Sequence, residues 1–92
     1  MDFADFSVSS IQRIATTPDG PMFMGSVEIG LSENVAGRDI IQRVKMTVRV
    51  TTKTDANFET LERTLFERAK LLLGQMRDFL QEETVESLRQ RS

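Results

Sequence analysis

The apolar residues of this 92-residue chain change their spacing once, near residue 55, and this change constrains the fold more than any other feature. Before it, apolar and polar residues alternate, which is the period of a β-strand with one buried face. After it, apolar residues recur every three or four positions and fill an arc of roughly 140°, as in an amphipathic helix. The sequence therefore predicts an α+β fold, an antiparallel three-stranded β-β-β-α meander with one long C-terminal helix packed on one sheet face.

A hairpin turn is indicated by the segment Thr17-Pro18-Asp19-Gly20. Proline presets the first central dihedral of a turn and glycine accepts a left-handed conformation, so strands are expected at about 6–16 and 22–31. The alternation of the first strand is broken, which either a bulge near Ser9-Ser10 or a short helix over 3–14 would explain. We favour the strand, because the turn needs a partner on its upstream side.

A polar connection is expected over residues 32–38, with Gly37 as its flexible point, and the most regular strand pattern of the chain follows at 39–53. Enrichment in β-branched residues supports a strand there. At about 3.3 Å per residue it would reach roughly 45–50 Å, so we expect a bent strand or one that extends beyond its own protomer. Its apolar face contains Ile40, Val44, Met46, Val48 and Val50.

The helix is expected at about 56–82, where the side chain of Asp55 or Asn57 can cap the free amides of the first turn. Its apolar stripe stops after Leu80, so residues 83–92 are expected either to fray or to pack separately. No internal repeat, low-complexity tract or linker interrupts the pattern, and we therefore expect residues 1–92 to form a single domain.

Self-association is expected from the small size of the chain. A folded monomer of this mass would expose roughly 5,400 Å² and bury about 64% of the surface of the unfolded chain. This fraction is small for a domain that has no disulfide bond or metal ion to stabilise it. Cysteine is absent, so no disulfide can contribute. We therefore expect a homodimer or higher homo-oligomer. The candidate oligomer contacts are Met22 and Met24, on the strand face opposite Phe23, and Leu71 and Gly74, on the back of the helix.

The second face of the long strand is basic. A two-stranded ribbon can use such a face to bind nucleic acid, and an acidic protein partner is the other candidate. Against nucleic acid, the chain has 12 basic and 14 acidic side chains and no aromatic residue on this face. Glu28 and Glu33 are also expected to neutralise cations across the sheet. The candidate contact residues are Arg43, Lys45, Arg49 and Lys53.

Enzymatic chemistry has little support in the sequence. Histidine and cysteine are both absent, which removes the usual general bases, nucleophiles and zinc ligands. No glycine-rich phosphate loop occurs, so we assign no catalytic, cofactor-binding or metal-binding residue and expect no cofactor. The leading prediction is a small interaction or structural protein that binds itself and an unidentified protein partner. Nucleic-acid binding is the first alternative, and a ligand binder or enzyme with a pocket between sheet and helix is the second.

The sequence also contains no feature that is typical of membrane insertion. Its longest apolar runs, such as Leu71-Leu72-Leu73, are far too short to span a bilayer. The acidic residues at the start of the chain do not resemble a secretory signal. On these grounds we expect a cytoplasmic protein without a membrane partner.

Overall fold

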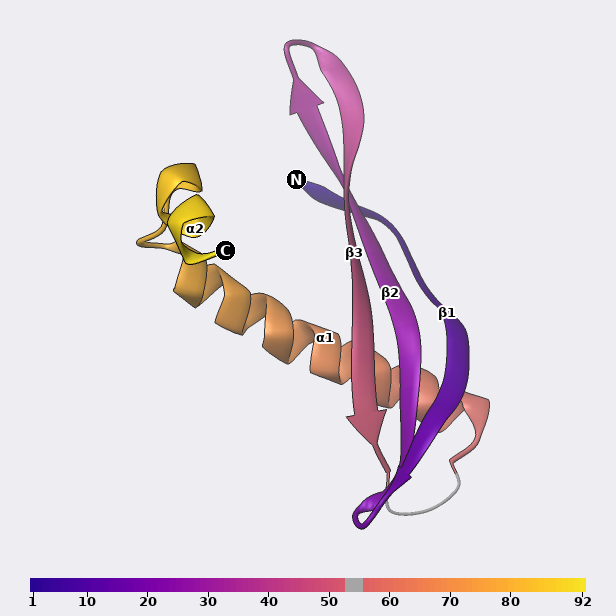
Figure 1. Cartoon of the computed structure of the whole chain (residues 1–92). Coiled ribbons are helices and arrows are strands. Elements are labelled where there is room, and N and C mark those ends of the chain that lie inside the picture. The colour runs from indigo at the N-terminus through magenta and orange to yellow at the C-terminus, as the bar shows by residue number, and fades with distance from the viewer. Residues whose placement is uncertain (53–55) are drawn as a thin grey trace.

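The computed structural model describes residues 1–52 and 56–92. It shows a three-stranded antiparallel sheet in the order β1-β2-β3, followed by two helices (Figure 1). The elements are β1 (Asp2–Thr17), β2 (Gly20–Val35), β3 (Arg38–Thr51), α1 (Phe58–Leu80) and α2 (Val85–Arg91). The predicted α+β meander with a C-terminal helix packed on the sheet is therefore confirmed. Within the described residues, no helix combines the length and the apolar character needed to cross a lipid bilayer.

The β1–β2 hairpin closes at the predicted turn. Thr17 pairs with Gly20, and the Thr17 hydroxyl donates to the Gly20 carbonyl at 2.8 Å. Gly20 has a φ of 124°, which a residue with a Cβ rarely adopts. The register shifts between Ser9 and Gln12, and Ser10 has a φ of 56°. This is the bulge that the broken alternation predicted, and the alternative of a helix over 3–14 is wrong.

The β2–β3 hairpin is longer than expected, and the predicted polar connection over 32–38 is wrong. β2 continues to Val35 and β3 begins at Arg38, which leaves only Ala36 and Gly37 in the turn. Both residues have a positive φ, 52° and 80°, as in the tight turns that match the twist of a hairpin. The polar residues before the turn therefore belong to a two-stranded ribbon whose surfaces are largely exposed to solvent.

The core lies at the end of the sheet nearest the N-terminal half of α1. Leu65 and Ala69 of the helix are fully buried, and they pack with Val27 and Val48, each 1% exposed. Gly25 permits this approach, because a Cβ there would lie 2.7 Å from a terminal carbon of Leu65. The helix and the sheet are therefore in close contact over the first three turns of α1.

The two ends of α1 are defined by capping contacts. Asn57 is the N-cap, and its side-chain oxygen accepts from the amide of Thr60 at 2.8 Å. The other candidate cap, Asp55, and the candidate contact residue Lys53 lie outside the described residues. After Leu80 the chain turns, and Thr84 caps the short helix α2 in a capping box with Ser87. Residues beyond the apolar stripe thus form a separate helix rather than a continuation of α1.

A charged contact holds α2 against the end of α1. Arg91 of α2 forms an ion pair with Glu83 at 2.6 Å, and its guanidinium lies 5.5 Å from the centre of the Phe79 ring. The Glu83 side chain is only 8% exposed, although it carries a charge. The last turn of α1 and the whole of α2 therefore form one unit, which Figure 1 shows on the side of the molecule away from the sheet.

Candidate interaction surface

The molecule exposes more surface than a compact monomer of its size. Its accessible area is 7,008 Å², whereas a monomeric protein of the same mass exposes about 5,400 Å². Its radius of gyration is 16.3 Å, against about 12 Å for a compact domain of this length. The difference in area, about 1,600 Å², is surface that a closed core would have removed from water.

Much of this surface is apolar and lies on the sheet face that carries α1. Cross-strand partners share a face, and the pairs Phe3–Leu31 and Ile29–Val44 continue the face of the buried Val27. Beyond the reach of the helix, large apolar side chains on this face are between 36% and 66% exposed. They are Phe3, Leu31, Val35, Ile40 and Val44. The apolar face of β3 is thus buried only in its second half.

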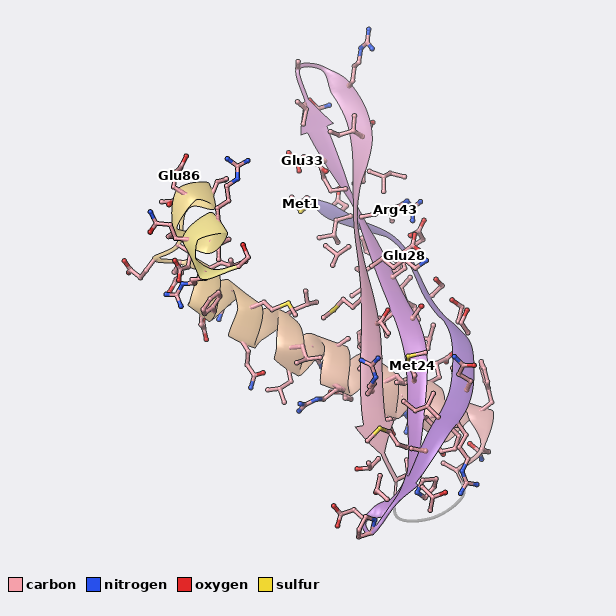
Figure 2. The ribbon with its side chains drawn as sticks, in the orientation of Figure 1. Met1, Met24, Glu28, Glu33, Arg43 and Glu86 are labelled. Atoms are coloured by element: carbon pink, nitrogen blue, oxygen red, sulfur yellow. The ribbon has the colours of Figure 1, made fainter. Side chains whose placement is uncertain are left out.

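The apolar stripe of α1 is likewise buried in one half and exposed in the other. Leu61, Leu65 and Ala69 are buried against the sheet, and the same stripe continues through Met76 and Phe79. Met76, Phe79 and the neighbouring Leu80 are each about half exposed, between 49% and 53%. Figure 1 shows that this half of α1 has passed the edge of β3 and extends away from the sheet. In Figure 2, Glu86 of α2 and Glu33 of the β2–β3 ribbon mark the two separate arms of the molecule.

The two edges of the sheet differ. β1 has three register shifts along its pairing with β2, whereas β3 pairs with β2 without interruption from Arg38 to Thr51. Thr52 donates its amide to the Pro21 carbonyl at 3.0 Å, and residues of an antiparallel strand bond alternately to either side. Even-numbered residues of β3 therefore bond to β2, and the backbone groups of odd-numbered residues 39–51 point to the other side. No strand of the described chain pairs with that edge.

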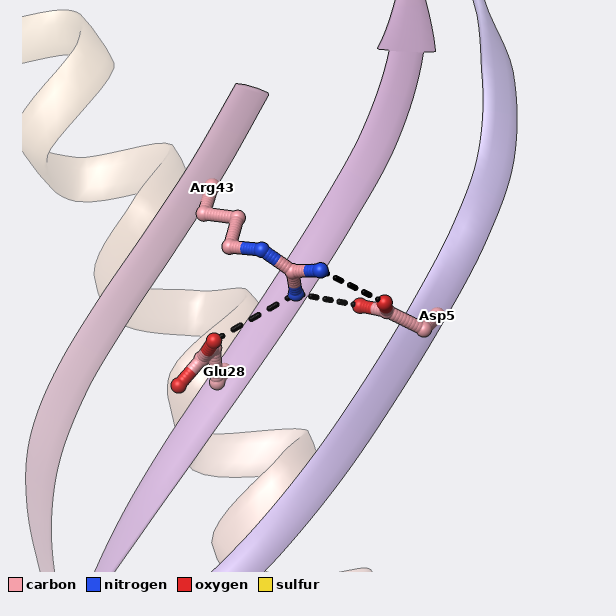
Figure 3. Close-up of polar contacts among 3 residues, drawn as sticks. All are labelled: Asp5, Glu28 and Arg43. Atoms are coloured by element: carbon pink, nitrogen blue, oxygen red, sulfur yellow. Dashed lines mark hydrogen bonds and ion pairs between the residues drawn. The ribbon is translucent and has the colours of Figure 1, made fainter. Parts of the chain in front are cut away.

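The basic face of β3 is partly neutralised within the chain. Arg43 reaches across the central strand to Asp5 on β1, with two contacts of 2.7 and 2.9 Å, and also contacts Glu28 at 3.4 Å (Figure 3). Gly30 lies between Asp5 and Arg43 in the register, and a Cβ there would lie 2.6 Å from the Asp5 carboxylate. The hydrogen bonds to Asp5 and its charge, with a smaller effect of Glu28, raise the pKa of Arg43 above its ordinary value.

The remaining cations are not gathered into one site. Lys45 and Arg49 are exposed on the same face as Arg43, and neither forms an ion pair with a described residue. Glu28 does contact a cation as predicted, but Glu33 pairs with Ile40 on the opposite face of the sheet and cannot reach this cluster. The predicted four-residue basic face is thus reduced, in the described residues, to two free cations and one that is already paired.

The candidate oligomer contacts lie in different environments. Met22 and Met24 are half-buried on the sheet face away from α1, beside Thr51 and Arg49 of β3. Leu71 is half exposed on the back of the helix. A Cβ at Gly74 would have no atom within 4 Å, so no other backbone of the described chain approaches this glycine. The structure therefore brings only Met22 and Leu71 near each other, at a depression between β3 and α1, and leaves Met24 and Gly74 apart from them.

An open depression of about 530 Å³ lies between the end of β3 and α1. Met22, Arg49, Thr64, Glu67, Arg68 and Leu71 contribute to its walls. It occupies the position of the sheet–helix pocket that a ligand binder would need, but it is open to solvent on the back of the helix. Among the described residues, no three acidic side chains meet where they could hold a metal ion.

The sequence patterns missed the largest feature of this surface, which is that sheet and helix cover each other over only half their lengths. The one available signal was the strand length, which predicted that β3 would be bent or extend beyond its own protomer. The Ala36-Gly37 turn that lengthens the ribbon gave no such signal, because alanine is not a typical residue for a positive φ. No known protein family matches the chain, and neither a curated protein nor a solved structure shows significant similarity to it.

Proposed function

We propose that this chain is a non-enzymatic interaction protein that works as a self-associated assembly, the smallest form of which is a homodimer. The observation that carries the proposal is the accessible area of 7,008 Å², compared with about 5,400 Å² for a compact monomer of this mass. A single chain leaves half of its sheet face and half of its helix stripe in water. A second copy supplies both missing halves, because each copy carries the same two surfaces.

The size of the uncovered surface fits a stable dimer. If each copy buries the excess of about 1,600 Å², the interface buries about 3,200 Å² in total, within the range of obligate homodimers. The exposed half of the stripe contains an aromatic side chain, Phe79, flanked by Met76 and Leu80. Full burial of an exposed side chain of this kind contributes roughly 1.5–3 kcal/mol. These three are about half exposed, so an interface would gain about half of this from each, which makes them candidates for its energetic centre.

The proposal is tested by the mass of the protein in solution. Native mass spectrometry and sedimentation velocity between 1 and 100 µM should show a dimer or a higher symmetric oligomer. Phe79→Glu should weaken the association by at least about tenfold, since it places a charge in the apolar centre. Gln75→Glu is the matched control, because it adds the same charge to an exposed polar position on the same part of α1. A wild-type protein that is monomeric at 100 µM contradicts the proposal.

Binding of nucleic acid is the second candidate, and the exposed cations Lys45 and Arg49 are the observation in its favour. Its weakness is that Arg43 already contacts two carboxylates of its own sheet. Salt-dependent retention on a DNA column distinguishes the two functions, because phosphate contacts weaken steeply with salt. Retention that disappears in the double variant Arg43→Glu, Arg49→Glu supports this candidate, and retention that survives the change contradicts it.

A further inference from the structure

The free edge of β3 is an open site for strand pairing. Its odd-numbered residues direct backbone N–H and C=O groups outward over a strand of 14 residues, without a bulge or a proline. The opposite edge, β1, is interrupted by three register shifts, which is how natural sheets block pairing at an edge. Of the two edges, only β3 presents a regular row of hydrogen-bonding groups along most of its length.

The position of α1 indicates where further strands belong. The helix has 23 residues and a length of about 35 Å, whereas three strands at about 4.8 Å spacing place the outer strands only about 10 Å apart. Figure 1 shows α1 crossing β1, β2 and β3 and continuing past the edge of β3. Met76 and Phe79 lie on this overhanging half. Strands added at the edge of β3 would lie over them.

We propose that β3 of a second copy pairs antiparallel with β3 about a twofold axis, so that two sheets become one six-stranded sheet. This inference rests on the proposed self-association and names its surface. The overhanging half of α1 from each copy then covers sheet residues of the other, including Val44, which is 48% exposed at the edge. The arrangement is reciprocal, as an isologous contact requires. It also closes the only long, unprotected edge of the described sheet.

The charges on β3 oppose this pairing only weakly. If the twofold axis lies between Lys45 and Arg49, these cations of the two copies come close to one another on the face away from α1. Arg43 adds little repulsion, because Asp5 and Glu28 already neutralise it. A directly opposed pair of like charges weakens an association by about fivefold at most, which is small compared with the effect of burying the apolar overhang. The cations therefore favour some alignments of the two strands over others without preventing the contact.

Disulfide trapping tests this geometry directly, because the natural chain has no cysteine. Single cysteines are placed at each of residues 41–47 and at Arg49, because the twofold axis can pass through an odd or an even residue of β3. Ser7, on the face of β1 away from α1, is the control. At a twofold axis, one residue of β3 lies opposite the same residue of the second copy, and their Cα atoms are within the distance that a disulfide spans. Covalent dimers should form at one position of β3 or at two neighbouring positions, and not at Ser7. Covalent dimers at no position of β3 overturn the inference.

A variant that changes the backbone of β3 provides a second test of the pairing. Thr47 has its amide on the free edge, so Thr47→Pro removes one hydrogen bond per copy, two in the proposed dimer, and none of those to β2. Thr47→Val is the control, because it keeps the amide. Thr47→Pro should abolish the dimer while the circular dichroism spectrum is unchanged, and Thr47→Val should remain dimeric. If Thr47→Pro does not fold, the cysteine series alone decides.

The outcomes separate this inference from the proposal on which it rests. Suppose that the wild type is a dimer, that no cysteine on β3 forms a disulfide, and that Thr47→Pro remains dimeric. This result overturns the β3 pairing but leaves self-association intact. A wild-type monomer overturns both. A monomer that gains thermal stability from a synthetic peptide of alternating acidic and apolar residues also overturns the inference, because the edge then takes an extended segment of another protein.

Discussion

Two glycines of the central strand provide a matched test of where the core ends. Gly25 and Gly30 are both buried in β2, but on opposite faces. A Cβ at Gly25 would lie 2.7 Å from Leu65, which is 0% exposed and has no space into which to move. A Cβ at Gly30 would lie 2.6 Å from the carboxylate of Asp5, whose side chain is 47% exposed and can rotate into water.

The two alanine variants should therefore differ in sign or in size. Overpacking of a core costs about 1–3 kcal/mol, and the buried Leu65 cannot move aside, so Gly25→Ala should cost the upper end of this range. Alanine in place of glycine returns up to about 1 kcal/mol through the unfolded chain, which leaves a net loss of about 2 kcal/mol. Gly30→Ala disturbs only an exposed ion pair, so its free energy of unfolding should change by less than about 1 kcal/mol in either direction.

Urea unfolding followed by far-ultraviolet circular dichroism measures both variants, since the chain has no tryptophan or tyrosine for fluorescence. With a slope near 1 kcal/mol per molar urea, a loss of about 2 kcal/mol moves the midpoint by about 2 M. All samples need the same protein concentration, because the stability of a dimer depends on it. If Gly25→Ala is as stable as the wild type, or if Gly30→Ala is the more damaging change, the packing described for this core is incorrect.

Three further predictions concern the core, the helix start and the edge of β3. Leu65→Ala should lower the free energy of unfolding by about 2–5 kcal/mol in the same urea assay, because Leu65 is fully buried between helix and sheet; a loss below 1 kcal/mol would show that the helix is not docked there. Asn57→Ala should cost about 1 kcal/mol through loss of the N-cap bond to Thr60, and Asn57→Asp, which keeps the acceptor, should restore most of it. Raising sodium chloride from 50 to 500 mM should tighten self-association measured by sedimentation, since salt screens the repulsion between Lys45 and Arg49 of the two copies; weaker association at high salt argues for attraction between unlike charges instead.

The sequence predicted those parts of the fold that depend on local patterns. The break in alternation at Ser9-Ser10 predicted the bulge, and the change of period predicted a helix packed on the sheet. The tight turn at Ala36-Gly37 was missed, because alanine is not a typical residue for a positive φ and the polar ribbon before it lacks a buried face. Without a buried face, a strand shows no alternation from which it could be recognised.

The candidate surface was harder to predict for a different reason. Leu65 and Phe79 belong to the same apolar stripe, yet one is buried in the core and the other is about half exposed. A periodic pattern shows which residues share a face, but it carries no information on how much of that face the rest of the chain can cover. The contact between Arg43 and Asp5 likewise depends on a register across three strands, which a single sequence does not specify.

The ion pair between Arg43 and Asp5, which crosses the central strand at Gly30, affects how β1 aligns on β2. β1 has three register shifts along β2, and the alignment of such a strand depends on which of its side chains must face the core. A shift by one residue would turn Phe6 away from Phe66 of the helix and bring Asp5 onto the apolar side of the sheet. It would also remove the partner of Arg43. The ion pair thus stabilises one alignment of β1 relative to its neighbours. Its main effect is therefore to make the folded state unique, rather than to raise the free energy of unfolding.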